Sequence, residues 1–160
     1  MSVFYLESSA LFKRYRTEKG TDLVNSVFAG RTGSDVLVTS QLVIMEMESA
    51  AARGLKGRVL GRQAYGAMLR AFAEDLGDML VLPLTGVAVV EAGHVARQWA
   101  LRALDALHLA SAVGVRRATQ VQFVVVSADR EILQASKLAG FDVLDPEDQD
   151  ALAVLERLRA

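Results

Sequence analysis

Short apolar runs alternate with amphipathic segments along the chain. Five runs of four to six residues, rich in valine, leucine and phenylalanine, predict buried β-strands at Val3–Leu6, Asp35–Thr39, Met79–Leu82, Val121–Val126 and Phe141–Leu144. Segments with apolar residues three or four positions apart predict helices at Ser9–Glu18, Thr21–Ala29, Gln41–Arg53, Arg58–Leu76, Thr85–Trp99, Leu101–Ala118 and Ala128–Ala139. A terminal helix is predicted to start at Asp145–Asp148, which has an N-cap residue, a proline and an acidic first turn.

Strands that are apolar throughout and alternate with helices are typical of a parallel sheet covered on both faces. We therefore expect an α/β fold, a three-layer α/β/α sandwich around a mainly parallel sheet of about five strands, with residues 1–160 forming a single domain. In such folds, sites gather beyond the carboxyl ends of the strands, often where the strand order switches.

Composition excludes several classes of protein. Hydrophobic residues make up 52% of the 160, which is enough for a sizeable core and too many for a disordered chain. The absence of cysteine excludes disulfides and cysteine-based zinc sites. The first residues do not resemble a signal peptide, and no apolar stretch is long enough for a membrane span, so we expect a cytoplasmic protein. A net charge of −1 excludes a globally basic nucleic-acid binder but allows a local basic patch.

One carboxylate, Asp105, lies inside the apolar helical segment Leu101–Ala112. It belongs to a stripe of polar residues spaced three apart, namely Arg102, Asp105, His108 and Ser111. A carboxylate among leucine and alanine loses hydration, so it needs a cation, a metal or hydrogen bonds. A local ion pair between Asp105 and Arg102 is one of the partners that the spacing allows.

Three further carboxylates fall where the fold predicts a site. Glu7 follows the first strand, and Asp129 follows the fourth, so both lie at the carboxyl edge of the sheet. Glu46 shares a helix side with apolar residues, whereas Glu48 points about 140° away from Val43 of that side. Converging carboxylates repel one another, and a divalent metal removes that penalty. Oxygen ligands without cysteine favour Mg²⁺ or Mn²⁺, a site suited to phosphodiester hydrolysis.

Each candidate also has an ordinary structural interpretation. Asp129 is placed to begin a helix, Glu7 to lie in a solvated loop and Glu46 to border a surface face. His108 is typical of a packed helix histidine, and Ser127 of a helix cap.

Four segments carry a more specific pattern. They are Tyr5–Tyr15, Ser40–Ala50, Leu101–Ala112 and Phe123–Asp129, the last followed by Gly140–Pro146. Together they resemble the PIN-domain family, and within it the VapC-type toxin ribonucleases. The match spans nearly the whole chain in the family's order, and Leu101–Ala112 is its most specific part.

This resemblance implies a PIN-like α/β sandwich that cleaves single-stranded or looped RNA with Mg²⁺ or Mn²⁺. Matched by position, the acidic quartet is Glu7, Glu46, Asp105 and Asp129. Asp105 and Glu7 would be the principal metal ligands, and the other two would coordinate directly or through water. The family has aspartate at the first position, so Glu7 departs from the pattern. Its extra methylene implies weaker activity or a preference for Mn²⁺.

The resemblance also implies a small antitoxin partner and a homodimer. An apolar surface around Leu42, Met45, Met68, Leu69 and Phe72 is a candidate contact, although core burial explains these residues equally well. Three basic clusters are candidates for contacts to RNA phosphates: Lys13, Arg14, Arg16 and Lys19; Arg53, Lys56, Arg58 and Arg62; and Arg116 with Arg117. Solvated faces and charges that complement helix ends explain each cluster as well.

Two other functions stay open. In the first, the chain is a PIN-like domain that binds RNA or a partner and has lost catalysis through Glu7. In the second, it is a doubly wound nucleotide-binding or receiver-like domain. The second is disfavoured because no glycine-rich phosphate loop follows the first strand.

Overall fold

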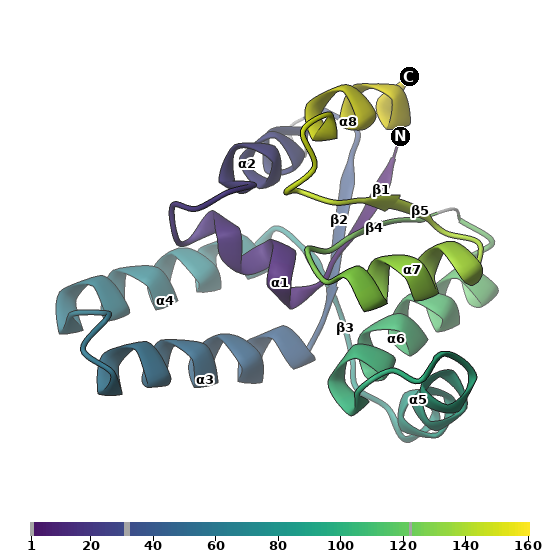
Figure 1. The fold of residues 1–160 in the computed structure, drawn as a ribbon, viewed down its shortest axis with the longest axis horizontal. Helices are drawn as coiled ribbons and strands as arrows, with labels where there is room; N and C mark the ends of the chain where they lie inside the picture. The colour runs from purple at the N-terminus through teal and green to yellow at the C-terminus, as the bar shows by residue number, and fades with distance from the viewer. Residues whose placement is uncertain (1, 31–32, 122) are drawn as a thin grey trace.

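A five-stranded parallel sheet forms the centre of the computed structural model, which describes residues 2–30, 33–121 and 123–160 (Figure 1). The strands are β1 (Val3–Leu6), β2 (Val36–Ser40), β3 (Leu80–Leu82), β4 (Phe123–Val126) and β5 (Asp142–Leu144). They lie in the order β3-β2-β1-β4-β5, and Tyr5 of the central strand is opposite Val38 of β2 and Val125 of β4. The expected parallel sheet is confirmed.

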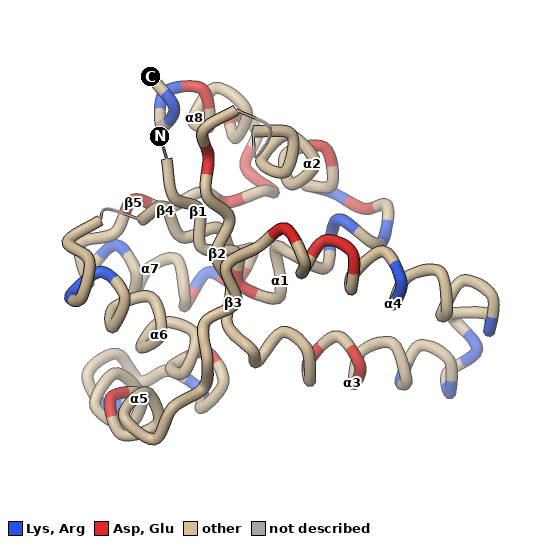
Figure 2. Tube along the Cα trace, turned by 180° about the vertical axis from the view of Figure 1, so that it is seen from behind, with Lys and Arg blue, Asp and Glu red and all other residues tan. Residues whose placement is uncertain are grey.

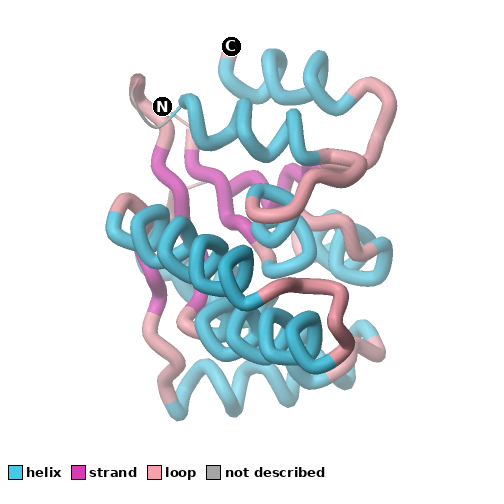
Figure 3. The backbone as a smooth tube through the Cα atoms, turned by 90° about the vertical axis from the view of Figure 1, so that its left-hand side faces the viewer, coloured by secondary structure: helices cyan, strands magenta, loops and turns pink. Residues whose placement is uncertain are grey.

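Helices cover both faces of this sheet (Figure 3). The first face carries α1 (Ser8–Leu11), the 3₁₀ helix η1 (Phe12–Arg14), α2 (Thr21–Ala29), α3 (Leu42–Lys56), α4 (Arg62–Gly77) and α8 (Ala151–Arg159). The second face carries α5 (Gly86–Trp99), α6 (Ala103–Thr119) and α7 (Arg130–Leu138). Each set packs on the sheet through its own apolar cluster, as a three-layer sandwich requires.

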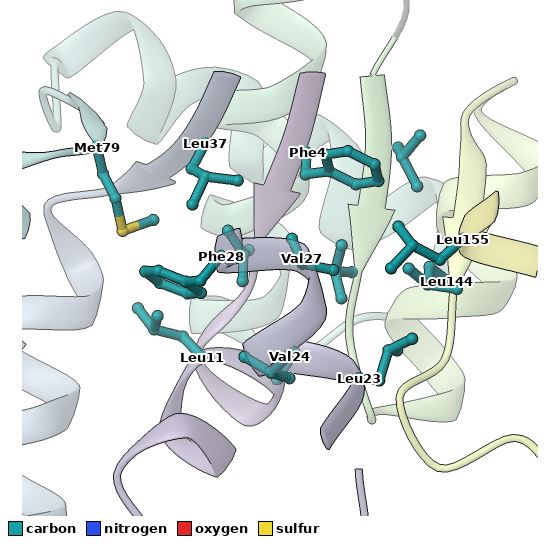
Figure 4. Close-up of a cluster of buried hydrophobic side chains, with 14 of the residues drawn as sticks. Phe4, Leu11, Leu23, Val24, Val27, Phe28, Leu37, Met79, Leu144 and Leu155 are labelled. Atoms are coloured by element: carbon teal, nitrogen blue, oxygen red, sulfur yellow. The ribbon is translucent and has the colours of Figure 1, made fainter. Parts of the chain in front are cut away.

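Alternation along β1 divides the core between the two faces. Phe4 and Leu6 belong to the first cluster, whereas Val3 and Tyr5 belong to the second. Successive side chains of a strand point to opposite faces, so one apolar run supplies both clusters. Figure 4 shows the first cluster, in which side chains of the sheet, Phe4 among them, pack with those of α2, Val27 among them.

The strand order switches beside β1, and the switch determines where the site lies. The chain runs from β1 to β2 and β3 on one side, then crosses to β4 on the other. The backbone N–H of Glu7, directly after β1, donates to the Val126 carbonyl at the end of β4 (3.0 Å). Glu7 and Ser127 therefore lie together at the carboxyl ends of the two central strands, where parallel sheets open a crevice.

The first helix is shorter than the predicted Ser9–Glu18, and buried contacts of one lysine explain why. Lys13 is 5% exposed, and its ammonium pairs with Glu147 at 2.6 Å. The Thr21 hydroxyl donates to the Lys13 carbonyl at 2.8 Å, so this carbonyl is used by a turn rather than by a continuing helix. The chain therefore leaves α1 and η1 through a turn.

Two predicted helix ends are wrong, because Gly54 lies within a helix and Arg58 lies in a turn. The α3 helix runs through Gly54 to Lys56, beyond the predicted end at Arg53. A side chain at Gly54 would place its Cβ 3.3 Å from the Leu60 Cβ, so this glycine allows a close approach instead. Arg58, the predicted start of α4, has a left-handed φ of 58° and lies in the turn before that helix.

The terminal helix also begins later than predicted. Asp145 accepts a hydrogen bond from the Glu147 backbone N–H (2.8 Å), which makes a local turn, and α8 starts only at Ala151. The predicted strand Val121–Val126 is observed as β4 from Phe123, and Gln122 lies outside the described residues.

The candidate contact surface is largely core. Leu42 and Phe72 are buried, and Met68 and Leu69 are partly buried against the first cluster, so only Met45 of this set is mostly exposed, at 55%. Within the described ranges, no helix has the length and apolar character that crossing a membrane requires.

Candidate active site

All four predicted carboxylates line one pocket of about 430 Å³. They come from different parts of the chain: Glu7 from the loop after β1, Glu46 from α3, Asp105 from the first turn of α6 and Asp129 from the N-cap of α7. The pocket opens at the carboxyl ends of the central strands, as the strand order requires. Ser9 and Arg102 also line it.

Glu7 is held almost completely by hydroxyl donors. Its Oε1 accepts from the Ser8 hydroxyl at 2.6 Å. Its Oε2 accepts from the Ser127 hydroxyl at 2.8 Å, from the Ser9 backbone N–H at 3.1 Å, and from the Ser9 hydroxyl. Glu7 is thus the N-cap of α1 and is only 3% exposed. The prediction of a solvated loop residue does not describe this buried, hydrogen-bonded carboxylate.

Arg102 links the next two carboxylates. Its Nε donates to Asp105 Oδ2 at 2.8 Å, and its Nη2 donates to Asp129 Oδ2 at 2.9 Å. The other Asp129 oxygen, Oδ1, caps α7 by accepting from the backbone N–H groups of Glu131 and Ile132. Asp129 therefore has its helix-capping role and also presents one oxygen to the pocket. The Arg102 side chain itself is 72% exposed.

Glu46 contacts a buried histidine. Its Oε2 lies 2.8 Å from His108 Nε2, and the Tyr5 hydroxyl lies 2.9 Å from His108 Nδ1. His108 and Tyr5 are each 1% exposed, whereas 17% of the Glu46 side chain is exposed. Burial raises the pKa of Tyr5 well above its ordinary value, and the charges of Glu7 and Glu46 raise it further, so the phenol keeps its proton. Glu48, the rejected alternative, is exposed.

The carboxylates influence one another electrostatically. Burial raises the pKa of Asp105, the Arg102 guanidinium opposes this shift, and the charges of Asp129 and Glu7 add to it. The donor set suits a hard divalent cation, because it consists of carboxylate oxygens. As the described residues stand, however, no three Asp, Glu or His side chains are close enough to hold a metal ion. Arg102 places its positive charge between two of the four carboxylates instead.

Two features of the site were not expected from the sequence. Ser127 was interpreted as a helix cap, yet its hydroxyl donates to Glu7 and accepts from the Asp129 N–H. His108 is buried, as expected of a packed histidine, but it also hydrogen-bonds Glu46. The spacing of three in the polar stripe could have indicated a site role for His108, because it places this residue on the same side of the helix as Asp105, one turn later.

Many of the predicted RNA-contacting cations are used within the fold. Lys13 pairs with Glu147, Arg14 with Asp75 and Arg117 with Glu91. Arg116 lies over the Phe141 ring at 3.9 Å and donates to the Ala139 carbonyl. In Figure 2, the blue of the second cluster gathers where α3 passes to α4, at the end of this hairpin away from the sheet. The basic residue at the pocket itself is Arg102, which belongs to none of the three clusters.

Comparison with known proteins agrees with this architecture. The PIN domain family matches residues 4–138 of the chain. The chain belongs to the PIN-domain family. Its relatives include Ribonuclease VapC45 and Ribonuclease VapC49 from two strains of Mycobacterium tuberculosis. Each is 31% identical over 150 residues, which make up 91% of this chain and 100% of the relative.

Several solved structures share the fold. PAE2754 from Pyrobaculum aerophilum superposes with a TM-score of 0.63 at 26% identity, covering 99% of this chain and 98% of that one. VapBC2 from Rickettsia felis, solved bound to a DNA fragment from its promoter, gives a TM-score of 0.64 at 11% identity, covering 89% and 98%. At that identity the likeness is one of fold alone.

Asp105→Asn is expected to stabilise the metal-free protein at neutral pH. Because the folded-state pKa of Asp105 is raised, the folded protein binds this proton more tightly, and stability falls as pH rises from the ordinary value of 3.8 through the folded pKa. Thermal melts with chelator present should give a higher Tm for the variant at neutral pH and a smaller difference in acid. The exposed Asp142 of β5 supplies the control Asp142→Asn. A lower Tm for Asp105→Asn at neutral pH contradicts the prediction.

Proposed function

We propose that this PIN-domain protein is a metal-dependent endoribonuclease and the toxin of a VapBC-type toxin–antitoxin pair. The observation that carries the proposal is the meeting of four carboxylates in one pocket at the switch point beside β1. The ribonuclease names of the relatives at 31% identity support RNA as the substrate. With RNA as its substrate, the protein would act in the cytoplasm.

In this proposal Glu7 and Asp105 are the principal ligands of Mg²⁺ or Mn²⁺, and Glu46 and Asp129 complete the set. The bound ion would supply the positive charge that activates water and steadies the leaving oxygen of a phosphodiester. The chain's own contribution is to hold these oxygens in place. The hydroxyls of Ser9 and Ser127 orient Glu7, and the first turn of α6 fixes the backbone of Asp105.

Arg102 is the group that must give way when the ion binds. Its guanidinium occupies the space between Asp105 and Asp129, where it neutralises part of their charge. The side chain is 72% exposed, so leaving this position sacrifices little packing. Once displaced, a guanidinium at the rim of the pocket can pair with an RNA phosphate.

A small antitoxin is the proposed protein partner. Structural neighbours of this chain were solved as VapBC and FitAB assemblies with DNA, including those from Rickettsia felis and Salmonella typhimurium. We also propose a homodimer, as expected for this type of toxin. Within the candidate contact surface around Phe72, most residues are buried, and Met45 is the one most accessible to a partner.

A second candidate is a PIN-like domain whose catalysis is weakened at Glu7. The observation that favours it is that both Glu7 oxygens already accept hydrogen bonds from the protein. An ion that binds Glu7 must share those oxygens with serine donors. In this case the domain would bind RNA or a partner without efficient cleavage.

The proposed activity is tested by incubating structured RNA with the wild-type protein and Mg²⁺ or Mn²⁺. We expect cleavage that stops with chelator and that falls roughly 100-fold or more in Asp105→Asn, the scale on which one charge-stabilising group matters. Asp142→Asn, which replaces an exposed carboxyl on β5, should cleave like the wild type. Equal cleavage by Asp105→Asn and the wild type would refute the assignment.

Glu7→Asp separates the two candidate functions. The serine hydroxyls around Glu7 fit a glutamate, and an aspartate is one methylene too short to reach them. For an active enzyme, we therefore expect roughly a 10-fold loss of cleavage. A gain over the wild type would instead favour the weakened domain. Glu48→Asp makes the same change at an exposed position of the α3 helix and should alter nothing.

A further inference from the structure

A buried histidine and tyrosine stand directly behind the pocket carboxylate Glu46. We propose that His108, whose ring is fixed by the Tyr5 hydroxyl at Nδ1, is a positioning residue that aims Glu46 into the pocket. The proposal rests on the proposed function and deepens it, because it adds two residues outside the acidic quartet to the catalytic apparatus.

The three residues come from three elements and form a continuous chain of hydrogen bonds. Tyr5 lies on β1, His108 on α6 and Glu46 on α3. The Tyr5 hydroxyl is 2.9 Å from His108 Nδ1, and His108 Nε2 is 2.8 Å from Glu46 Oε2. The two rings also meet edge to face, with centroids 6.1 Å apart and an interplanar angle of 76°. Both polar atoms of the imidazole therefore have partners inside the protein.

The direction of these hydrogen bonds follows from what each group can donate. An ionised Glu46 carboxylate only accepts, so His108 Nε2 must carry a hydrogen. A neutral imidazole then has a lone pair on Nδ1, and the Tyr5 hydroxyl is placed to donate to it. Without that donor, the buried Nδ1 lone pair would have no partner, and the ring would lose the contact that fixes its orientation toward Glu46.

The position of Tyr5 makes this arrangement rigid. Tyr5 belongs to the central strand, paired on both sides with β2 and β4, and it is only 1% exposed. Glu46 by contrast is on the pocket wall, and a glutamate there has several rotamers to choose from. His108 therefore connects Tyr5, which the sheet holds in place, to Glu46, whose side chain α3 alone would leave free to change rotamer.

Burying these polar groups is costly, which argues against simple space-filling. Tyr5 belongs to the second apolar cluster and His108 is buried beside it, where a phenylalanine and a leucine would avoid the desolvation penalty. The hydrogen bonds that offset this penalty lead to a pocket carboxylate. Partners of this kind behind metal-binding carboxylates and histidines typically change metal affinity or activity by 10–100-fold.

The tautomer is tested first, by nitrogen-15 NMR of the imidazole. The chain has only two histidines, so His94→Gln leaves the His108 signal alone. At mildly alkaline pH we expect a hydrogen on Nε2 and none on Nδ1, and Tyr5→Phe should shift the Nδ1 resonance because it removes the hydrogen bond to that lone pair. A ring with its hydrogen on Nδ1, or with both nitrogens protonated, overturns the proposal.

The positioning role is tested by Mn²⁺ titration and by kinetics on the same RNA. Tyr5→Phe and His108→Leu should each weaken Mn²⁺ binding or lower kcat roughly 10-fold, with KM unchanged. His108→Gln should recover most of the loss, because its amide nitrogen can still donate to Glu46. Equal losses in the Gln and Leu variants, or no loss in Tyr5→Phe, would show that His108 only packs.

The controls separate this inference from the proposed function. Tyr15→Phe removes another tyrosine hydroxyl that donates to a carboxylate, Asp75, away from the pocket, and should behave like the wild type. Tyr5→Phe keeps the ring, so it remains a test even if a His108 variant fails to fold. If the wild type cleaves no RNA, the proposed function fails, whereas the tautomer and the Mn²⁺ affinities still decide the role of His108.

Discussion

Carboxylates gathered in a small volume repel one another, and the residues around the pocket must offset this repulsion. The parallel sheet brings Glu7 and Asp129 to its carboxyl edge, and two helices add Glu46 and Asp105. The pKa of Asp105 is raised mainly by burial, and the charges of Asp129 and Glu7 add a smaller contribution. The surroundings offset the repulsion in different ways: Arg102 by its charge, serines by their hydroxyls and His108 by its imidazole. A divalent ion would relieve the same repulsion, which is why this cluster suits phosphodiester hydrolysis.

The proposed ligands differ in how firmly the fold holds them. Glu7 is nearly saturated with hydrogen bonds, and Asp129 has one oxygen committed to capping α7. Asp105 is linked mainly to Arg102, a mostly exposed side chain that a bound metal ion would displace in the proposed function. The site therefore combines preorganised oxygens with one displaceable cation. A carboxylate that stays partly buried at a cost in folding stability is typical of a functional site.

Much of the fold was predictable because its signals are local. Apolar strands such as Val3–Leu6 and the cap at Thr85 depend on neighbouring residues, and both are observed. The inward side of Glu46 followed from helical periodicity, although its role as a ligand stays a prediction. What local patterns could not supply were contacts between distant parts of the chain. Ser127 reaches Glu7 across 120 positions, and Lys13 reaches Glu147 across 134, so neither partner was visible in the sequence.

In the proposed function, the four carboxylates share a metal ion that replaces the Arg102 guanidinium. The most direct measurement is a crystal structure of the protein grown with Mn²⁺, with data collected for its anomalous signal. We expect a manganese peak bounded by Asp105, Glu7 and the other two carboxylates, with Arg102 turned away from Asp105 and Asp129. Arg102 still bridging those two aspartates, with no manganese between the carboxylates at saturating Mn²⁺, would contradict the account.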